Sequence, residues 1–397
     1  MSRRTALGAV AAGAAWLCGC GGGGGSEFGG ASVAGITSGG TGSFTTGTVS
    51  GLGSIIVRNV RYDDSRASVS RSDDGVVGSI RPGMVVAIEA TAVVPAQPGA
   101  TLANATALRI SYASEWVGRI DAVDTTAGTV TVLGQTIEVA DAAVIEGAAT
   151  RLSALAAGQF VEVHGDLDLG AGRLLATLVE VSAAAPSAFH LSGQVTSLDT
   201  AARTFRIGTA VIGYDASVAL PSGFANGMLV RVVLGTTQVA GTWPAQRIRT
   251  REVLAGVEAG EQDEAEVEGT LMSIGPGATF NVNGIPVDAS GLPAVAGLAL
   301  GVLVKAEGSM RGGVLVATRV EVKSRSVLQP EDFVFIGPVS GLNILTRTFT
   351  LQGQLFTYGL ATPISVINWL TGATPTVEVH AVRVNGQWQA TEIKEAA

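Results

Sequence analysis

Hydrophobic and polar residues alternate along most of the chain after residue 43, in short runs separated by glycine-containing turns. Alternation with a period of two predicts half-buried β-strands. A typical run is Gly128-Thr-Val-Thr-Val, and a short turn joins it to Gln135-Thr-Ile-Glu-Val. Two such runs so close together predict a β-hairpin.

The same order of strands recurs five times. Each repeat opens on a strand that contains glycine, and the opening glycines stand 68 to 76 residues apart, at Gly47, Gly118, Gly193, Gly269 and Gly337. A hairpin follows, then a less regular stretch, and then two more strands such as Val161-Glu-Val-His and Ala176-Thr-Leu-Val-Glu-Val. Repetition at a nearly fixed interval predicts tandem copies of one small domain.

Five short strands in about 70 residues predict a small closed barrel, because closure leaves no exposed sheet edge. We therefore predict an all-β protein of about five tandem, five-stranded antiparallel barrels of the OB-like type. Domains of this size bury only about 60% of their unfolded surface, so we expect neighbouring domains to pack on one another. The expected domains are residues 44–113, 114–186, 187–254, 266–325 and 332–397, with an acidic linker at residues 255–265.

The repeats resemble a family of exported bacterial β-domains known as domain of unknown function 5666 (DUF5666). The resemblance rests on the opening Gly-x-[Val/Ile]-x-x-[Leu/Ile/Val]-Asp of Gly118–Asp124 and Gly193–Asp199, on the Thr-[Val/Phe]-x-[Val/Ile] strand, and on the late Gly-x-x-Val-x-Val-x-Gly strand. The first repeat lacks the aspartate, the fourth shortens the opening turn, and the fifth has Ala381 in place of the late glycine. These motifs consist of glycines and core aliphatic residues, so the resemblance implies a fold and no chemistry.

The first residues have the pattern of an export signal. Arg3 and Arg4 precede an uncharged, alanine-rich run from Ala6 to Leu17, which is too short to span a bilayer. The two arginines also bear a faint resemblance to a twin-arginine signal, so the general secretory route and the twin-arginine route both stay open. Removing residues 1–19 takes the net charge from −8 to −10, because Arg3 and Arg4 are lost.

The run ends in Leu17-Cys18-Gly19-Cys20, followed by five glycines and a serine. This resembles the bacterial lipoprotein box, with an aliphatic residue at −3, a small residue at −1, and an acylated cysteine as the new N-terminus. We predict a lipoprotein signal peptide at residues 1–19, lipidation of Cys20, and a Gly/Ser-rich tether at residues 20–43. Cys18 fits the box poorly because bulky side chains precede it. An ordinary cleaved signal and an uncleaved anchor helix remain the alternatives.

The predicted lipoprotein signal places the chain in the cell envelope, facing the periplasm, at the outer membrane rather than the inner one. The predicted mature chain has one cysteine, Cys20, which the lipid would block, and a chain without free thiols suits an oxidising compartment. Its acidic charge repels phosphate backbones, which argues against nucleic acid as a partner. The expected partners are the membrane, through the lipid, and another envelope protein or a glycan.

Candidate chemistry is sparse. The chain lacks the Gly-x-Ser-x-Gly elbow, the phosphate-binding loop and the His-Glu-x-x-His zinc motif. His164 and His380 end similar strands, but the other repeats carry Glu89, Val233 and Glu307 at that place. Because the position accepts such different residues, we interpret it as an outward-facing barrel position. The sequence thus predicts no catalytic residue, no cofactor and no metal site.

The acidic turns lead to the same conclusion. The segment Asp166-Leu-Asp168-Leu-Gly170 lacks the later bidentate glutamate of a calcium loop. The segment Ser72-Asp-Asp-Gly75 reads as a solvated turn, and His190 has no obvious partner. The leading hypothesis is a non-catalytic scaffold or binding module. The alternative is a periplasmic enzyme acting on polysaccharide or peptide, with Asp124, Asp199 or Asp288 in a site assembled between domains.

Overall fold

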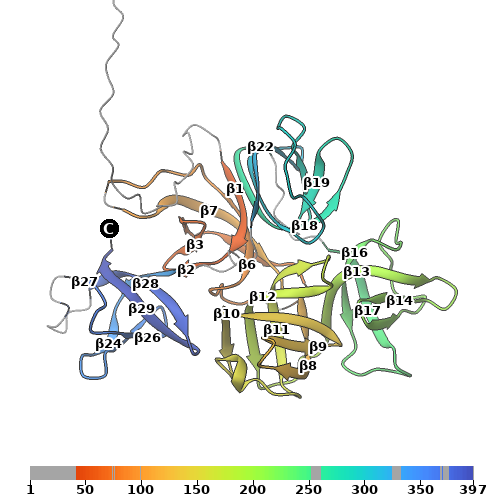
Figure 1. Cartoon of the computed structure of the whole chain (residues 1–397), viewed down its shortest axis with the longest axis horizontal. Coiled ribbons are helices and arrows are strands. Elements are labelled where there is room, and N and C mark those ends of the chain that lie inside the picture. The colour runs from red at the N-terminus through yellow and green to blue at the C-terminus, as the bar shows by residue number, and fades with distance from the viewer. Residues whose placement is uncertain are drawn as a thin grey trace, which may run out of the picture. The chain divides into compact units, whose positions relative to one another are not determined.

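The computed structural model describes residues 42–73, 75, 77–98, 100–251, 261–323, 332–366, 369 and 375–396 (Figure 1). The elements in this part of the chain are almost all β-strands, and a 3-10 turn at Leu152–Ala154 interrupts them. All of the described residues belong to one compact unit. The protein is therefore all-β, as the alternation of its residues predicts.

The second barrel shows how each set of strands closes. It consists of β8 (Trp116–Asp124), β9 (Thr129–Val132), β10 (Gln135–Gly147), β11 (Phe160–Asp168) and β12 (Arg173–Ser182). Antiparallel pairs join β8 to β9, β9 to β10, β12 to β11, and β11 back to β8. The remaining pair, β10 with β12, is parallel and completes the ring. The parallel pair differs from the all-antiparallel expectation, because the chain crosses the barrel between its third and fourth strands.

Four further sets of strands in the described residues keep this order. The third barrel consists of β13 (Phe189–Asp199), β14 (Thr204–Ile207), β15 (Ala210–Gly213), β16 (Leu229–Leu234) and β17 (Trp243–Thr250). The fourth consists of β18 (Gln262–Ile274), β19 (Thr279–Val282), β20 (Ile285–Asp288), β21 (Leu303–Arg311) and β22 (Val314–Lys323).

In the first and fifth barrels the opening strand is divided into two pieces. The first barrel consists of β1 (Ser43–Thr48), β2 (Gly51–Leu52), β3 (Ile55–Val57), β4 (Val60–Asp63), β5 (Ser68–Arg71), β6 (Val85–Ala90) and β7 (Ala103–Tyr112). The fifth consists of β23 (Phe333–Pro338), β24 (Ser340–Asn343), β25 (Thr348–Leu351), β26 (Gln354–Tyr358), β27 (Ile364–Ser365), β28 (Thr376–Val384) and β29 (Gln387–Glu395).

The opening glycine of each repeat lies where the first strand crosses the hairpin of the second and third strands. A Cβ atom on Gly193 would lie 2.3 Å from Cγ2 of the buried Ile207, and one on Gly269 would lie 2.0 Å from Nδ2 of Asn283. Asn283 and Gly284, at the tip of their hairpin, both have positive φ, as a two-residue type I′ turn requires. The signature glycine of the repeat is thus a point of close approach between strands.

Hydrophobic cores continue from one barrel into the next. Trp116 of the second barrel and Leu191 of the third belong to one buried cluster. Phe44 and Ala87 of the first barrel pack into the core of the fourth barrel, beside Val267. Each small barrel therefore gains buried apolar surface from its neighbours, which offsets the limited core that about 70 residues can build alone.

Strand edges also join the barrels. β8 pairs with β13 of the third barrel in antiparallel fashion. β1 runs parallel to β18 of the fourth barrel, and β2 runs parallel to β23 of the fifth. The first barrel thus contacts barrels that follow it by some 200 to 300 residues, as the register partners Ser43 and Glu264 illustrate.

Buried ion pairs reinforce these junctions. Glu115, just before β8, accepts hydrogen bonds from Arg251 at 3.0 Å (Nε) and 2.5 Å (Nη2), and Arg231 lies 3.8 Å away. Between the first and fourth barrels, Arg58 forms ion pairs with Glu266 and Glu268. Each of these ion pairs joins residues of two different barrels.

The acidic segment expected as a linker at residues 255–265 overlaps with a strand, since β18 begins at Gln262. Ala265 at the end of this segment and Val267 just beyond it are buried, while Glu266 between them meets Arg58 and Lys305. Period-two burial therefore overrides the acidic composition. Residues 252–260 lie outside the described residues.

The predicted signal peptide at residues 1–19, Cys20 and all but the end of the tether at residues 20–43 lie outside the described residues, and β1 already begins at Ser43. Within the described residues, no helix is long and apolar enough to cross a membrane.

Candidate functional site

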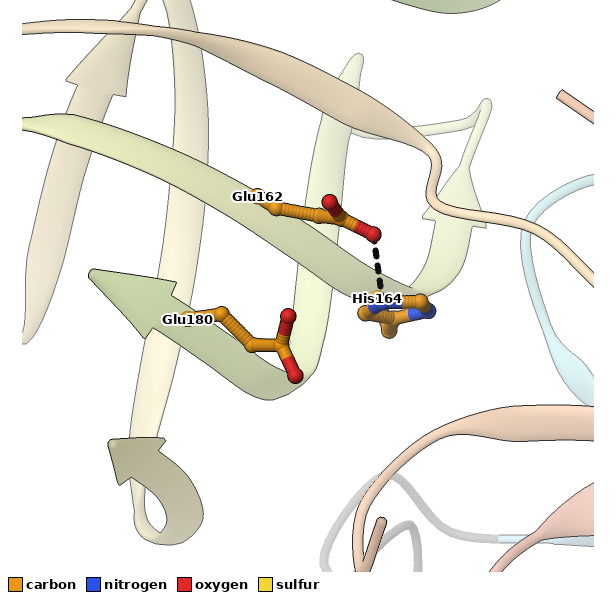
Figure 2. Close-up of side chains that lie close together, drawn as sticks. All are labelled: Glu162, His164 and Glu180. Carbon is orange, nitrogen blue, oxygen red and sulfur yellow. Dashed lines mark hydrogen bonds and ion pairs between the residues drawn. The ribbon is translucent and has the colours of Figure 1, made fainter. Parts of the chain in front are cut away.

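Three ligand-type side chains converge on the outer face of the second barrel (Figure 2). Glu162 and His164 lie two residues apart on β11, so they point to the same face of the strand. Glu180 lies on β12, directly opposite Glu162 in the strand register. One donor atom from each of Glu162, His164 and Glu180 lies within 4.8 Å of the others.

The local backbone explains the position of His164. The register between β11 and β12 shifts between His164 and Gly165, which is a β-bulge. A Cβ atom on Gly165 would lie 2.0 Å from the carbonyl oxygen of Leu175, so the bulge requires glycine here. The regular alternation of side chains along β11 is therefore interrupted directly after His164.

His164 is fully buried, with 0% of its residue surface exposed. Its Nδ1 lies 3.1 Å from the carbonyl oxygen of Ala113, in the segment that joins the first barrel to the second. The ring of Tyr112, at the end of β7, lies 6.5 Å from the ring of His164 between centroids. The side chain of His164 faces outward from its own barrel, as predicted, but the segment around Tyr112 and Ala113 covers it.

Two arginines of the first barrel reach the carboxylates. Arg71 donates a hydrogen bond to Glu162 at 2.7 Å through Nη2. Arg81 lies 3.1 Å from Oε1 of Glu180 and donates a 2.7 Å hydrogen bond to Glu146. The contact with Glu180 lacks hydrogen-bond geometry, so this oxygen has no hydrogen-bond partner among the described residues.

The two carboxyl groups differ in their protonation behaviour. Burial pushes the pKa of Glu162 upward, but His164 and Arg71 outweigh that effect, and its pKa lies below the usual value. Burial raises the pKa of Glu180 above its usual value, and His164 and Arg81 offset this only in part. Glu162 is thus held as a carboxylate, while Glu180 takes up a proton more readily than an exposed glutamate does.

Asp73 adds a third carboxylate to this junction, and unlike Glu162 and Glu180 it is fully buried. Its side chain has no exposed surface, and it accepts hydrogen bonds from Arg71 at 2.5 Å and from the backbone N–H of Ser114 at 2.7 Å. Burial opposes its charge, but Arg71 and Ser114 hold the pKa of Asp73 well below its usual range. The interpretation of this segment as a solvated turn is therefore wrong for Asp73, because its carboxylate is buried against Arg71 and Ser114.

The remaining polar residues singled out in the sequence fall into separate places. Asp166 is buried and accepts a 2.7 Å hydrogen bond from Asn283 of the fourth barrel. His380 contacts Asp332 and Glu378 on the fifth barrel. The Nδ1 of His190 is buried and has no hydrogen-bond partner within the described part of the chain. The structure therefore does not gather these groups with His164 into one centre.

The three aspartates considered for an enzyme stabilise turns. Asp124 accepts hydrogen bonds from the backbone N–H groups of residues 126 and 127, and Asp199 from those of residues 201 and 202. Asp288 accepts one from Ser290. These are Asx-type turns, the structural use that such residues commonly have.

A pocket of about 410 Å³ lies on the third barrel. Ser72 of the first barrel contributes to its wall, together with Leu220, Arg231, Arg247 and Arg249. Arginine side chains beside apolar surface suit an acidic group on a partner.

Sequence reasoning missed the Glu162–His164–Glu180 cluster because it treated repeats as equivalent. The spacing of Glu162 and His164 indicates a shared strand face, which was an available signal. The position of Glu180 follows from strand register, and the cover over His164 follows from barrel packing. Neither is encoded in a short motif.

Comparison with known proteins gives a match to one family model over part of the chain. The sequence model described as "Domain of unknown function (DUF5666)" matches residues 117–180, 268–321 and 336–394, in the second, fourth and fifth barrels. A solved structure from Drosophila, titled "drosophila Unr CSD456", shares 16% identity, over 52% of this chain and 96% of that chain, with a TM-score of 0.14. No curated protein matches the chain.

Proposed function

Three segments of this chain belong to the DUF5666 family, and on that premise we propose that the protein is a non-catalytic envelope lipoprotein. In this proposal its tandem barrels form a scaffold that binds another envelope component, a protein or a glycan. The lipid on Cys20 holds the scaffold at the membrane, facing the periplasm, with the outer membrane as the expected location.

One observation carries the scaffold role: the barrels are joined to partners distant in sequence. β1 pairs with β18 and β2 with β23, while Arg58 is held by two glutamates of the fourth barrel. A chain of independent domains would not need such contacts. Their presence supports a body that keeps its binding surfaces in fixed relation, and the pocket beside Arg247 and Arg249 offers one such surface.

The enzyme alternative finds less support. Asp124, Asp199 and Asp288 each accept hydrogen bonds from backbone N–H groups of their own turns. Acid–base catalysis by a carboxylate pair requires two groups within reach of one substrate, and these three serve three different barrels.

The membrane anchor is tested by metabolic labelling with an alkyne analogue of palmitate. The proposal predicts that the full chain and its Cys18→Ala variant take up the label, while Cys20→Ala does not. Label on Cys20→Ala, or none on the unaltered chain, would contradict lipidation at Cys20.

The scaffold role is tested by chemical cross-linking in intact cells, followed by purification from the detergent-solubilised envelope. A defined protein or glycan should be enriched with the unaltered chain and depleted with Arg58→Glu, which breaks the junction of the first and fourth barrels. The matched control is Arg311→Glu, because Arg311 is exposed and its ion pairs with Glu261 and Asp263 and its hydrogen bonds to backbone carbonyls all lie within the fourth barrel. Failure to recover any partner, or equal recovery with Arg58→Glu, would count against a scaffold.

A further inference from the structure

The geometry of the second barrel points to a metal site that the scaffold role does not require: we propose that Glu162, His164 and Glu180 bind one divalent transition-metal ion, with Zn²⁺ as the representative. The three donor atoms lie within 4.8 Å of one another. Zinc holds imidazole nitrogen and carboxylate oxygen at about 2.0–2.2 Å, which places two ligands of one ion about 3.4 Å apart. Small rotations of the two glutamate side chains would bring donor atoms that now lie within 4.8 Å of one another to the separation of about 3.4 Å that one zinc ion requires.

In the neutral form of His164, the hydrogen bonds leave Nε2 as the ring nitrogen that can bind a metal ion. A carbonyl oxygen only accepts hydrogen bonds, so the 3.1 Å contact with Ala113 assigns the proton of the neutral ring to Nδ1. The lone pair of Nε2 then faces Glu162, whose Oε1 lies 3.2 Å away. Two acceptors would face each other at this distance unless a cation lies between them, either the second proton of the ring or a metal ion that takes its place. Metal-binding histidines typically donate their other N–H to a carbonyl or carboxylate.

Comparison with the other barrels indicates that the fold does not need this group. The cross-strand pair formed by Glu162 and Glu180 brings two carboxylates together. None of the other four described barrels has two carboxylates at the equivalent pair, where the residues are Ala87 with Ser111, Arg231 with Arg249, Lys305 with Glu321, and Glu378 with Lys394. Directly opposed like charges destabilise a sheet; Arg71 and Arg81 compensate the two carboxylates in part, and a shared cation would add to that compensation.

The surroundings suit a bound ion. His164 is fully buried, and Oε1 of Glu180 has no hydrogen-bond partner among the described residues. Arg71 and Arg81 contact the same carboxylates from the first barrel, so the arginines can hold the two ligands in place. A nitrogen ligand beside two carboxylates favours transition metals over Mg²⁺ and Ca²⁺, which take oxygen ligands.

The test is calorimetric titration of the full chain with Zn²⁺, after chelator treatment and without a polyhistidine tag. One equivalent should bind, and His164→Gln should weaken the affinity by at least about tenfold, as should Glu180→Gln. His380→Gln is the matched control. It alters the same strand position in the fifth barrel, where Lys394 already neutralises the carboxylate, and it should leave the affinity unchanged.

Two further readouts keep the proposal falsifiable if the buried His164→Gln variant misfolds. Glu180 is partly exposed, so Glu180→Gln should fold normally and lose the zinc-induced rise in melting temperature that the unaltered chain shows. X-ray absorption at the zinc edge should report one imidazole with oxygen ligands. No binding at one equivalent, equal affinity in the Glu180→Gln variant, or preference for Ca²⁺ or Mg²⁺ would overturn the proposal.

Discussion

Replacing Glu115 by glutamine should destabilise the junction of the second and third barrels strongly. The side chains of Glu115 and Arg251 are 7% and 2% exposed, and they share two hydrogen bonds of 3.0 and 2.5 Å. Arg231 lies 3.8 Å from the same carboxylate. The substitution keeps the shape of the side chain but removes the negative charge that two buried guanidinium groups face.

The magnitude follows from the burial of these charges. Breaking a buried pair by removing one partner costs about 3–5 kcal/mol, because the remaining charge is left without compensation. Burial alone would raise the pKa of Glu115, but Arg251 and Arg231 outweigh it and hold that pKa below its usual value. The carboxylate therefore stabilises the fold above its unfolded pKa, and this contribution is lost as the pH falls through the lower folded value.

The assay is urea unfolding of the full chain near neutral pH, followed by tryptophan fluorescence. Trp116 reports directly on this junction, because its Nε1 donates a 2.9 Å hydrogen bond to the carbonyl oxygen of Ser192. Glu115→Gln should lower the free energy of unfolding by about 3–5 kcal/mol. Asp263→Asn is the matched control, because it breaks an exposed pair with Arg311, and it should cost no more than about 1 kcal/mol.

A second variant separates charge from packing. The triple variant Glu115→Leu, Arg231→Met and Arg251→Met replaces all three buried charges by apolar side chains and should cost less than Glu115→Gln alone. The reasoning would be refuted if Glu115→Gln cost less than about 1 kcal/mol, as exposed pairs do, or if the triple variant were the less stable of the two.

Three further predictions concern single residues. Gly193→Ala should cost about 1–3 kcal/mol in unfolding free energy, because its Cβ would lie 2.3 Å from the packed Ile207, whereas Gly291→Ala meets no atom within 4 Å and should be nearly neutral. Burial raises the pKa of Asp166 to about 6, so its contribution to stability falls as the pH rises from about 4 through 6, and Asp166→Asn should remove that fall in pH-dependent unfolding. Hydrogen bonds to Asp332 and Glu378 raise the pKa of His380 to about 9, so His380→Gln should destabilise the chain below about pH 6.5 and have no effect once the pH has passed about 9.

The strand order of the barrels was accessible from the sequence because local alternation and turn glycines determine it. Val130 and Val132 alternate with half-buried threonines on β9, as their spacing predicts. The family match covers the second, fourth and fifth barrels. The first and third barrels lie outside the matched residues, although Gly193–Asp199 carries the opening motif.

Features that depend on how barrels meet were not accessible from the sequence. Residues 262–265 were predicted to belong to an acidic linker, but they open β18, in which Glu266 and Glu268 pair with Arg58, some 200 residues earlier. His164 was correctly placed on the outside of its barrel, yet the segment around Ala113 buries it. Comparison of the repeats led us to discount His164, because the other repeats carry different residues at its position. A residue that contacts a neighbouring barrel in one repeat need not have an equivalent in the others.

The central claim is that the first barrel is joined to the fourth, so that the tandem barrels act as one body. Ser43 and Glu264 are register partners on β1 and β18, and neighbouring strands lie about 4.8 Å apart, within the Cα separation of about 4.4–6.8 Å that a disulfide spans. In a full chain with Cys18 and Cys20 replaced by serine, the pair Ser43→Cys with Glu264→Cys should oxidise nearly completely under native conditions and not in urea. The control pair Ser43→Cys with Asp263→Cys, whose second side chain lies on the opposite strand face, should stay reduced. Free thiols in the first pair under native conditions would contradict the account.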